Sequence, residues 1–362
     1  MGPHPRFADP LPPGEGEGRN GFTLRRRQLL TGLAAGAGLT TLAACFAPAS
    51  AVPAAAPAPA SASAVDPHAG HHAATAATDT TAPAPFANLD PFGYLESFDR
   101  GRVSKLPDGR TLREFDLFLE NRQVEVARGV TFRAWTFNGQ VPGPTLRVQA
   151  GDRVRVNFTN GGDHPHSVHF HGVHAAAADG GFESVAPGGS TSYEFDAEPF
   201  GCHMYHCHTG PLAKHLAKGL FGAYVVDPPG GRPPVDREMV MVQHGWDVDG
   251  DGENEFYAVN GPAFAYNESP IKLKLGERVR VYLVNATEFD PINSFHLHAN
   301  FFDYFPTGTR LEPSEFTDTV IQGQGQRGIL EFAYRFPGRY MFHAHKTEFA
   351  ELGWMGVFEV AA

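Results

Sequence analysis

The residues best suited to chemistry in this sequence are His206, Cys207 and His208, three adjacent side chains that can each bind a metal. If they lie on a β-strand, successive side chains alternate between its faces, so both imidazoles point one way and the thiolate points the other. A metal on the thiolate would then be connected to metals on the imidazoles through a few covalent bonds. The stretch therefore predicts two metal centres linked by one strand.

Four His-X-His units occur in the chain, two in each half: His169 and His171, His206 and His208, His296 and His298, and His343 and His345. On a strand, the two imidazoles of a unit lie on one face about 7 Å apart. That separation is too wide for both to chelate one small metal, but it suits ligands of neighbouring metals. Eight imidazoles could hold three metals, as two sets of three and one of two.

The first half carries further ligands that the second half lacks. His166 and His215 flank Cys207 in the sequence, and two imidazoles with a thiolate form the trigonal blue-copper set, usually with a weak axial Met. Leu220 stands five positions after His215, and without an axial sulfur the reduction potential of the copper should be high. Ala344 stands where the second half would need a cysteine, so we expect one such site in the chain.

The order of these motifs reflects a long-period repeat. Gly201 to His208 aligns with Gly338 to His345 at a constant offset of 137 residues. The runs 153–158 and 277–282 both alternate polar and apolar residues, which predicts strands with polar side chains facing out and apolar side chains facing in.

Turn residues separate these short runs and no helical stretch stands out, so each half favours a Greek-key β-sandwich. We therefore expect an all-β protein with domain 1 at 91–230 and domain 2 at 231–362, joined near the Pro-rich stretch 227–234.

The residues before position 91 are expected to form an export signal followed by a disordered tether. Residues 1–45 contain three consecutive arginines ending at Arg27 and a short Ala- and Gly-rich apolar run, which predicts a twin-arginine export signal. The sequence ending at Cys45 is similar to a lipobox, which would make Cys45 an acylated N-terminus, and an ordinary cleavable signal is the alternative. Residues 46–90 are rich in Ala and Pro and predict a disordered tether. We expect an exported protein of the periplasm or cell surface, with a lipid anchor at Cys45 favoured.

Composition excludes some partners and frameworks. Lys and Arg total 29 against 40 Asp and Glu, so a net charge of −11 gives a nucleic-acid partner no electrostatic support. Three cysteines cannot supply a disulfide framework. Eighteen histidines are the anomaly, and most of them cluster.

The motifs 166–172 and 206–208 resemble the histidine and cysteine motifs of two-domain multicopper oxidases whose blue copper lies in the first cupredoxin domain. The resemblance covers about residues 110–360 and implies two cupredoxin-like domains with four coppers per chain. It implies a type 1 copper at His166, Cys207 and His215, with Leu220 in the axial, non-ligating position. It implies a type 2 copper at His169 and His296. The type 3 pair would be held by His171, His206, His208, His298, His343 and His345. The sequence departs from the family at Leu220 and in a longer spacing from Cys207 to His215.

The resemblance implies a laccase-like oxidase that takes single electrons from a small reducing substrate and reduces O2 to water. It also implies a homotrimer in which domain 1 of one chain meets domain 2 of the next. Phenolic reductants are favoured over Cu(I), Fe(II) or Mn(II), because the chain has only six Met and no Met-rich insert.

Two other classes are considered. Copper nitrite reductases share the paired cupredoxin domains, but that family carries Asp where His169 stands and lacks a histidine after the ligand cysteine. A non-catalytic copper electron-transfer protein would need the blue-copper site alone. His169 and His208 favour oxygen reduction over nitrite reduction. The eight further imidazoles argue against a protein that only transfers electrons.

Several further residues are interpreted without a role in the metal centres. The expected copper sites do not need four further histidines: His164, His174, His203 and His244. The tether contains three more, which we interpret as incidental surface residues: His68, His71 and His72. Cys202 predicts a free, buried thiol. The stretch 247–255 imitates a calcium loop, but Ala258 replaces the bidentate Glu at its twelfth position, so a charged hairpin tip is favoured.

Overall fold

The computed structural model describes residues 84–362. The predicted signal and most of the tether, with Cys45, His68, His71 and His72, lie outside the described residues. Among the described residues, no helix has the length and apolar character needed to cross a membrane.

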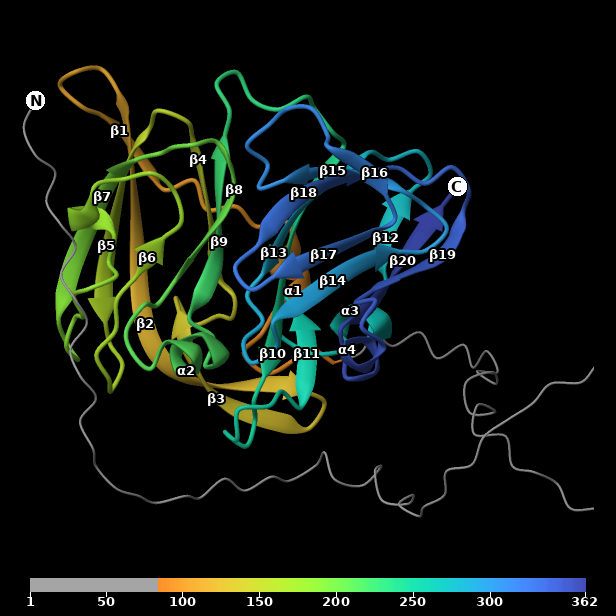
Figure 1. Ribbon diagram of the computed structural model, residues 1–362, viewed down its shortest axis with the longest axis horizontal. Coiled ribbons are helices and arrows are strands. Elements are labelled where there is room, and N and C mark those ends of the chain that lie inside the picture. Colours follow the sequence, from red (N-terminus) through yellow and green to blue (C-terminus); the bar gives the residue numbers. More distant parts are fainter. Residues whose placement is uncertain (1–83) are drawn as a thin grey trace, which may run out of the picture. The chain divides into compact units, whose positions relative to one another are not determined.

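Two sheets make up the first half (Figure 1). The first sheet has the order β1 (Arg102–Lys105), β2 (Thr111–Ala127), β5 (Arg153–Asn160) and β7 (Ser190–Asp196), with β3 (Val130–Phe137) paired to β2. The second sheet has the order β4 (Gly143–Gln149), β9 (Phe221–Asp227), β8 (Gly201–His206) and β6 (His169–Phe170).

The second half also forms two sheets. One has the order β11 (Phe256–Val259), β10 (Arg237–Trp246), β13 (Val279–Asn285), β18 (Arg327–Phe332), β15 (Phe302–Pro306) and β16 (Glu315–Thr317). The other has the order β12 (Ile271–Lys274), β20 (Met355–Ala361), β19 (Gly338–His343), β14 (Ile292–Leu297) and β17 (Thr319–Gly323). The helices are short: α1 (Pro91–Leu95), the 3-10 turn η1 (Ala176–Ala178), α2 (Leu212–Ala217), α3 (Ala265–Glu268) and α4 (Thr347–Glu351).

The two halves repeat the same pairings, which confirms the predicted duplication. Parallel pairs β2–β5 and β4–β9 correspond to β10–β13 and β12–β20, and antiparallel β8–β9 corresponds to β19–β20. Even unusual backbone angles recur, since φ is 151° at Gly201 and 150° at Gly338. The all-β fold with two sandwich-like halves is confirmed, whereas the domain boundary near residue 230 stays a prediction.

Hydrophobic side chains form one core within each half and a third between the halves. In the third core, Cys202 and Met204 of β8 belong to the same cluster as Tyr282 and Val284 of β13. Because Tyr205 of β8 belongs to the core of the first half, this strand is held between two packed layers.

The outward orientation predicted for the polar side chains of 277–282 is wrong at Arg280. Strand β5 alternates as expected, but every residue of β13 is buried, because apolar clusters cover both of its faces. Arg280 is 2% exposed and pairs with Glu331 at 2.6 Å and Glu238 at 3.1 Å. Carboxylates supplied by neighbouring strands offset the cost of burying this charge.

Candidate metal centre

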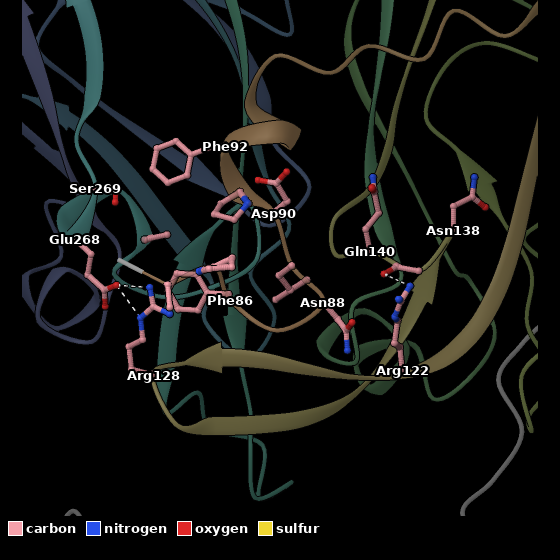
Figure 2. Close-up of a pocket in the computed structure, with 16 residues that line it drawn as sticks. Phe86, Asn88, Asp90, Phe92, Arg122, Arg128, Asn138, Gln140, Glu268 and Ser269 are labelled. Atoms are coloured by element: carbon pink, nitrogen blue, oxygen red, sulfur yellow. Dashed lines mark hydrogen bonds and ion pairs between the residues drawn. The ribbon is translucent and has the colours of Figure 1, made fainter. Parts of the chain in front are cut away.

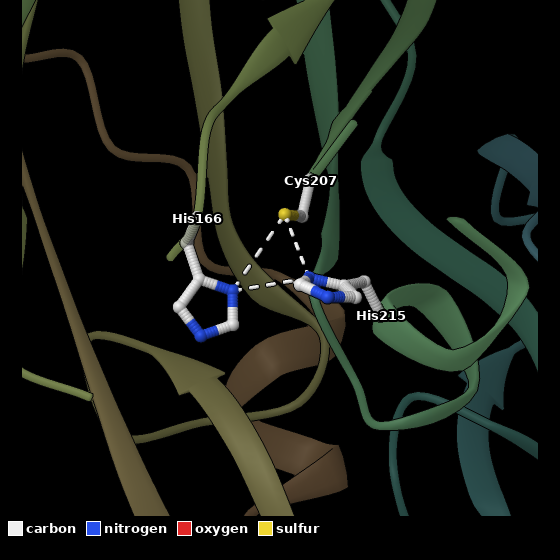
Figure 3. Close-up of side chains that lie close together, drawn as sticks. All are labelled: His166, Cys207 and His215. Carbon is white, nitrogen blue, oxygen red and sulfur yellow. Dashed lines mark hydrogen bonds between the residues drawn. The ribbon is translucent and has the colours of Figure 1, made fainter. Parts of the chain in front are cut away.

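The first candidate centre is the buried group His166, Cys207 and His215 (Figure 3). Cys207 directly follows β8, His166 lies just before β6, and His215 lies in α2. The Cys207 Sγ atom is 3.7 Å from His166 Nδ1 and 3.1 Å from His215 Nδ1, and the two nitrogens are 3.1 Å apart. Ligands about 2.0–2.3 Å from a shared metal lie roughly 3–4 Å from one another, so these atoms fit around one ion.

The protonation states suit a soft metal. Burial lowers the pKa of His166 to about 3 and that of His215 to about 4, so both imidazoles are neutral and keep a lone pair. Burial raises the pKa of the Cys207 thiol, although hydrogen bonds involving Ser167 and Thr209 oppose this. A cation must therefore displace the thiol proton, and a His2Cys donor set is the one that blue copper uses.

The walls of this pocket are apolar. Leu220 is fully buried and offers no donor atom, while its backbone accepts from Cys207 N at 3.0 Å and donates to His215 O at 3.3 Å. The Trp135 ring packs against His166 and His215 at centroid distances of 4.9 and 4.8 Å. These contacts exclude water from the thiolate and hold both imidazoles in place.

A second group, formed by His169, His171 and His206, lies behind the same strand. The β6–β8 register places His169 opposite His206, and His171 Nε2 lies 3.2 Å from His206 Nε2. His208 is exposed, and its ring centroid is 5.5 Å from that of His169. The side chains of His206 and Cys207 thus serve different groups, as the alternation predicts.

A third group repeats this arrangement in the second half with His296, His298 and His343. The β14–β19 register places His296 opposite His343, and His298 Nε2 lies 2.8 Å from His343 Nε2. His345 is exposed, with its ring centroid 5.0 Å from that of His296.

Most of these imidazoles are oriented by backbone carbonyls. Nδ1–H donates to a carbonyl oxygen and leaves Nε2 free for a metal, the usual arrangement around metal-bound histidine. The pairs are His169 with Asp179 at 2.9 Å, His206 with Cys207 at 2.9 Å, His208 with Gly181 at 3.1 Å, His296 with Asp318 at 3.0 Å and His343 with Ala344 at 2.7 Å.

One chain does not bring the two histidine sets together. Within residues 84–362, each grouped set takes all of its imidazoles from one half. The outermost histidines, His208 and His345, face solvent. The eight imidazoles are therefore arranged as two equivalent open half-sites.

The remaining histidines have other contacts. His203 and His244 are both 1% exposed: His203 Nε2 lies 2.8 Å from Pro199 O, and His244 Nε2 accepts from Gly261 N at 3.0 Å. The Nε2 atom of His174 lies 2.8 Å from Phe170 O, and exposed His164 pairs with Asp163. Cys202 is a free, buried thiol, as predicted, and burial raises its pKa to about 12.

The acidic stretch connects β10 to β11, which confirms the predicted hairpin tip. Carboxylate oxygens of Asp247, Asp249, Asp251 and Glu255 lie within 4.8 Å of one another. Backbone N–H groups of the same loop donate to them, as from Gly250 to Asp247 at 2.7 Å.

A separate cavity of about 790 Å³ lies beside α1 and the start of the described chain (Figure 2). Its polar contacts include the ion pair of Arg128 with Glu268 at 2.8 Å and a hydrogen bond from Arg122 to Gly139 O at 3.1 Å. Among the described residues, no histidine or cysteine lines this cavity, which separates it from the three metal-binding groups.

Three residues that contact candidate ligands were not predicted from the sequence. Ser167 Oγ accepts from His208 N at 3.3 Å, and Ser294 Oγ accepts from His345 N at 2.8 Å. These serines occupy equivalent places in the repeat, so a longer alignment of the halves would have found them. Arg327, whose Nη1 lies 3.2 Å from His171 Nδ1, comes from the other half and has no local signal.

Comparison with known proteins agrees with this geometry. Residues 119–231 and 236–362 each match a family model described as multicopper oxidase. A crystal structure of a multicopper oxidase is 59% identical, with a TM-score of 0.75, and the match covers 76% of this chain and 98% of that one. A blue copper oxidase from Nitrosomonas europaea is 29% identical, with a TM-score of 0.63, covering 69% and 86% of the two chains.

Among curated relatives, a copper-containing nitrite reductase of Neisseria meningitidis is 32% identical, and the match covers 60% of this chain and 61% of the relative. The chain thus spans about three fifths of the length of that nitrite reductase. The proteins similar to this chain thus include both oxidases and nitrite reductases. With both halves matched by family models and a copper-type donor set in place, this chain belongs to the multicopper oxidase family.

Proposed function

We propose that the protein oxidises a small reducing substrate one electron at a time and uses four such electrons, with four protons, to reduce O2 to two molecules of water. The observation that carries this proposal is the pair of histidine half-sites that exists in addition to the His2Cys group. An electron-transfer protein needs only the His2Cys group. The second and third groups supply ligands for the further coppers that a four-electron reaction requires.

In this proposal His166, Cys207 and His215 hold the copper that receives electrons. Copper bound at the three groups would supply reversible one-electron chemistry. Cys207 connects covalently to His206 and His208, so its backbone joins the buried pocket to the half-site behind it. The apolar wall made by Leu220 and Trp135 keeps water away from the thiolate.

We further propose that two copies complete each oxygen-reducing site, in a homotrimer where domain 1 of one chain meets domain 2 of the next. The type 2 copper would take His169 and His296, and the type 3 pair the other six imidazoles. Exposed aromatic side chains beside each half-site support this assembly: Phe182 is 94% exposed next to Gly181, and Phe316 is 69% exposed near Asp318. Exposed apolar residues of this kind favour burial against a partner.

The reducing substrate is proposed to be phenolic, as for laccases. Six methionines in the whole chain give little soft sulfur for collecting Cu(I). Turnover of a phenolic dye compared with that of Cu(I), each with and without added Cu(II), separates the two substrate classes.

Nitrite reduction is the second candidate, because curated relatives are named copper-containing nitrite reductases. His169 and His208 support the oxidase instead, since the resemblance implies that nitrite reductases lack both imidazoles. A single preparation tests the choice, by following O2 uptake, nitrite consumption and copper per chain with one reductant. The oxidase predicts four coppers per chain and O2 uptake without nitrite loss. One copper per chain and no O2 uptake would identify an electron-transfer protein, and nitrite loss a reductase.

Residues 1–45 are proposed to direct export, with Cys45 as the site of a lipid anchor. Mass spectrometry of the mature N-terminus tests both points. An acylated Cys45 supports the anchor, and an unmodified N-terminus at another residue rules it out.

A further inference from the structure

One aromatic ring packs against both imidazoles of the His2Cys group and against the surface of the protein. The centroid of the Trp135 ring lies 4.9 Å from that of His166 and 4.8 Å from that of His215. On its other side the same ring lies 5.1 Å from the ring of His164, which is exposed. His166 and His215 are themselves 0% and 3% exposed, so Trp135 links a buried ligand pair to the surface.

The backbone holds Trp135 in this position. Trp135 N donates to Lys218 O at 2.8 Å, at the end of α2. The next residue, Gly219, has a φ of 111°, and a Cβ atom at this position would lie 2.9 Å from Trp135 O. Glycine therefore allows α2, which carries His215, to approach β3, which carries Trp135.

This packing defines where a reductant can come close to the copper ligands. Electron transfer slows steeply as the distance between donor and acceptor grows, so a donor must approach the ligands closely. Among residues 84–362, His166 and His215 make their aromatic contacts with each other and with Trp135. A donor that touches the outer edge of Trp135 is thus separated from both ligands by a single indole ring.

The charge beside Trp135 is positive. Lys214 is exposed, and its Nζ lies 5.9 Å from the centroid of the Trp135 ring. Arg133 and Asp163 pair at 3.1 Å, so their charges offset each other. Lys214 takes part in no ion pair within the described part of the chain, and an unpaired surface cation raises the local concentration of anions.

We propose that reductants deliver their electrons at Trp135 and that Lys214 makes this contact selective for anionic phenols. In each step the phenol gives one electron to the copper of the His2Cys group and its hydroxyl proton to solvent, which leaves a phenoxyl radical. The indole ring conducts the electron and is not itself oxidised. This inference rests on the proposed function, because it takes that copper as the electron acceptor.

The test uses two phenols with the same methoxylated ring, neutral syringol and its carboxylated analogue, syringate. Copper-loaded full-length protein is mixed with each phenol without oxygen at low ionic strength, and bleaching of the Cys207 thiolate band gives the rate of electron transfer. The variants are Lys214→Glu, Trp135→Leu and Trp135→Phe. Lys272→Glu is the control, because it changes the net charge equally at an exposed lysine of β12 in the second half.

We expect Lys214→Glu to slow bleaching by syringate about 3–10-fold, the range expected for one or two exposed charge interactions, and to leave syringol unchanged. Salt should reduce the preference for syringate, because the Debye length falls from about 30 Å at 0.01 M to about 3 Å at 1 M. Equal effects of Lys214→Glu and Lys272→Glu would overturn the selectivity, since net charge would then explain it.

Trp135→Leu should slow bleaching by both phenols several-fold, and Trp135→Phe should restore part of the rate. The position of the thiolate band and the reduction potential should stay as in the wild type, which a merely structural loss would not allow. Wild-type rates in Trp135→Leu would overturn the proposed contact.

A second measurement needs no copper. The chain has three tryptophans, of which Trp246 and Trp354 are 0% and 1% exposed. In NMR of the copper-free full-length protein, syringate should shift the indole N–H signal that Trp135→Phe removes, more than syringol does, and Lys214→Glu should weaken this shift. An unmoved Trp135 signal would refute the proposal. If the protein consumes nitrite or takes up no O2, the proposed function fails, while this measurement still decides whether an anionic phenol binds at Trp135.

Discussion

The pocket at Cys207 and the equivalent pocket at Ala344 share one backbone arrangement but hold different side chains. The first contains metal-binding side chains, and the second contains aromatic ones. Cys207 N donates to Leu220 O at 3.0 Å, and Ala344 N donates to Trp354 O at 3.2 Å. A short helix follows in both halves, α2 in the first and α4 in the second. A hydrogen bond from Leu220 N to His215 O recurs as one from Trp354 N to Phe349 O at 2.8 Å, so Phe349 stands in the place of His215.

The second pocket is filled by side chains. Trp354 Nε1 donates to Asn293 Oδ1 at 3.1 Å, and Tyr257 stacks on Phe349 with ring centroids 3.6 Å apart. Among residues 84–362, no thiol or imidazole remains in this pocket to bind a metal, although the histidine pairs next to it are kept. The duplicated fold therefore supports the half-sites, whereas a few side chains decide which half can receive electrons.

The largest effect should come from removing the thiolate with Cys207→Ser. Because losing a residue that merely supports a ligand costs about 10–100-fold, losing this ligand should lower substrate oxidation by more than about 100-fold and abolish the visible band. Ala344→Cys is the matched control and should add no band, since the second pocket is filled. A band retained by Cys207→Ser, measured by absorption spectroscopy, would show that another residue holds the receiving copper.

Emptying the second pocket should mainly cost stability. Trp354 is 1% exposed, and truncating such a side chain costs about 3–5 kcal/mol, so Trp354→Ala should lower the free energy of unfolding by that amount. Denaturant titration of the copper-free protein measures it. The thiolate band of the copper-loaded variant should persist, and its loss would mean that the two pockets are not independent.

Lowering the pH should reveal a further difference between the pockets, because the described part of the chain places buried imidazoles, His166 and His215, in the first pocket and aromatic rings in the second. An unfolded histidine has a pKa near 6.5, and burial lowers that of His215 to about 4 in the folded protein. The unfolded chain therefore binds more protons between these values, so the stability contribution of neutral His215 is full above about pH 6.5 and falls as the pH drops toward 4.

His215→Phe copies the second pocket into the first and should flatten that dependence by up to about 1.4 kcal/mol per pH unit. Unfolding of copper-free wild type and variant at several pH values between 4 and about 6.5 measures this. Parallel curves for the two proteins would contradict a buried, neutral His215.

The smallest change should follow from giving the first pocket an axial sulfur. Leu220→Met offers a thioether next to the ligands, which stabilises Cu(II) and should lower the reduction potential of the receiving copper. Potentiometric titration of the thiolate band reports it. An unchanged potential would place residue 220 out of reach of the metal.

The sequence alone was enough to predict the all-β fold, the repeat and the groups that now cluster, because strand alternation and ligand spacing are local properties. His206 and Cys207 show this best, since neighbours on a strand must face opposite ways. The orientation of Arg280 was mispredicted because its carboxylate partners, Glu238 and Glu331, come from other strands.

Contacts between residues far apart in the chain were decided only by the tertiary structure. The packing of Trp354 into the second pocket, the separation of the two half-sites and the approach of Arg327 to His171 all depend on how layers pack, and no local spacing encodes them. The sequence by itself determined which residues can bind copper, since ligand chemistry belongs to residue types. The tertiary structure decided which of them meet in one chain, because that depends on packing between the halves.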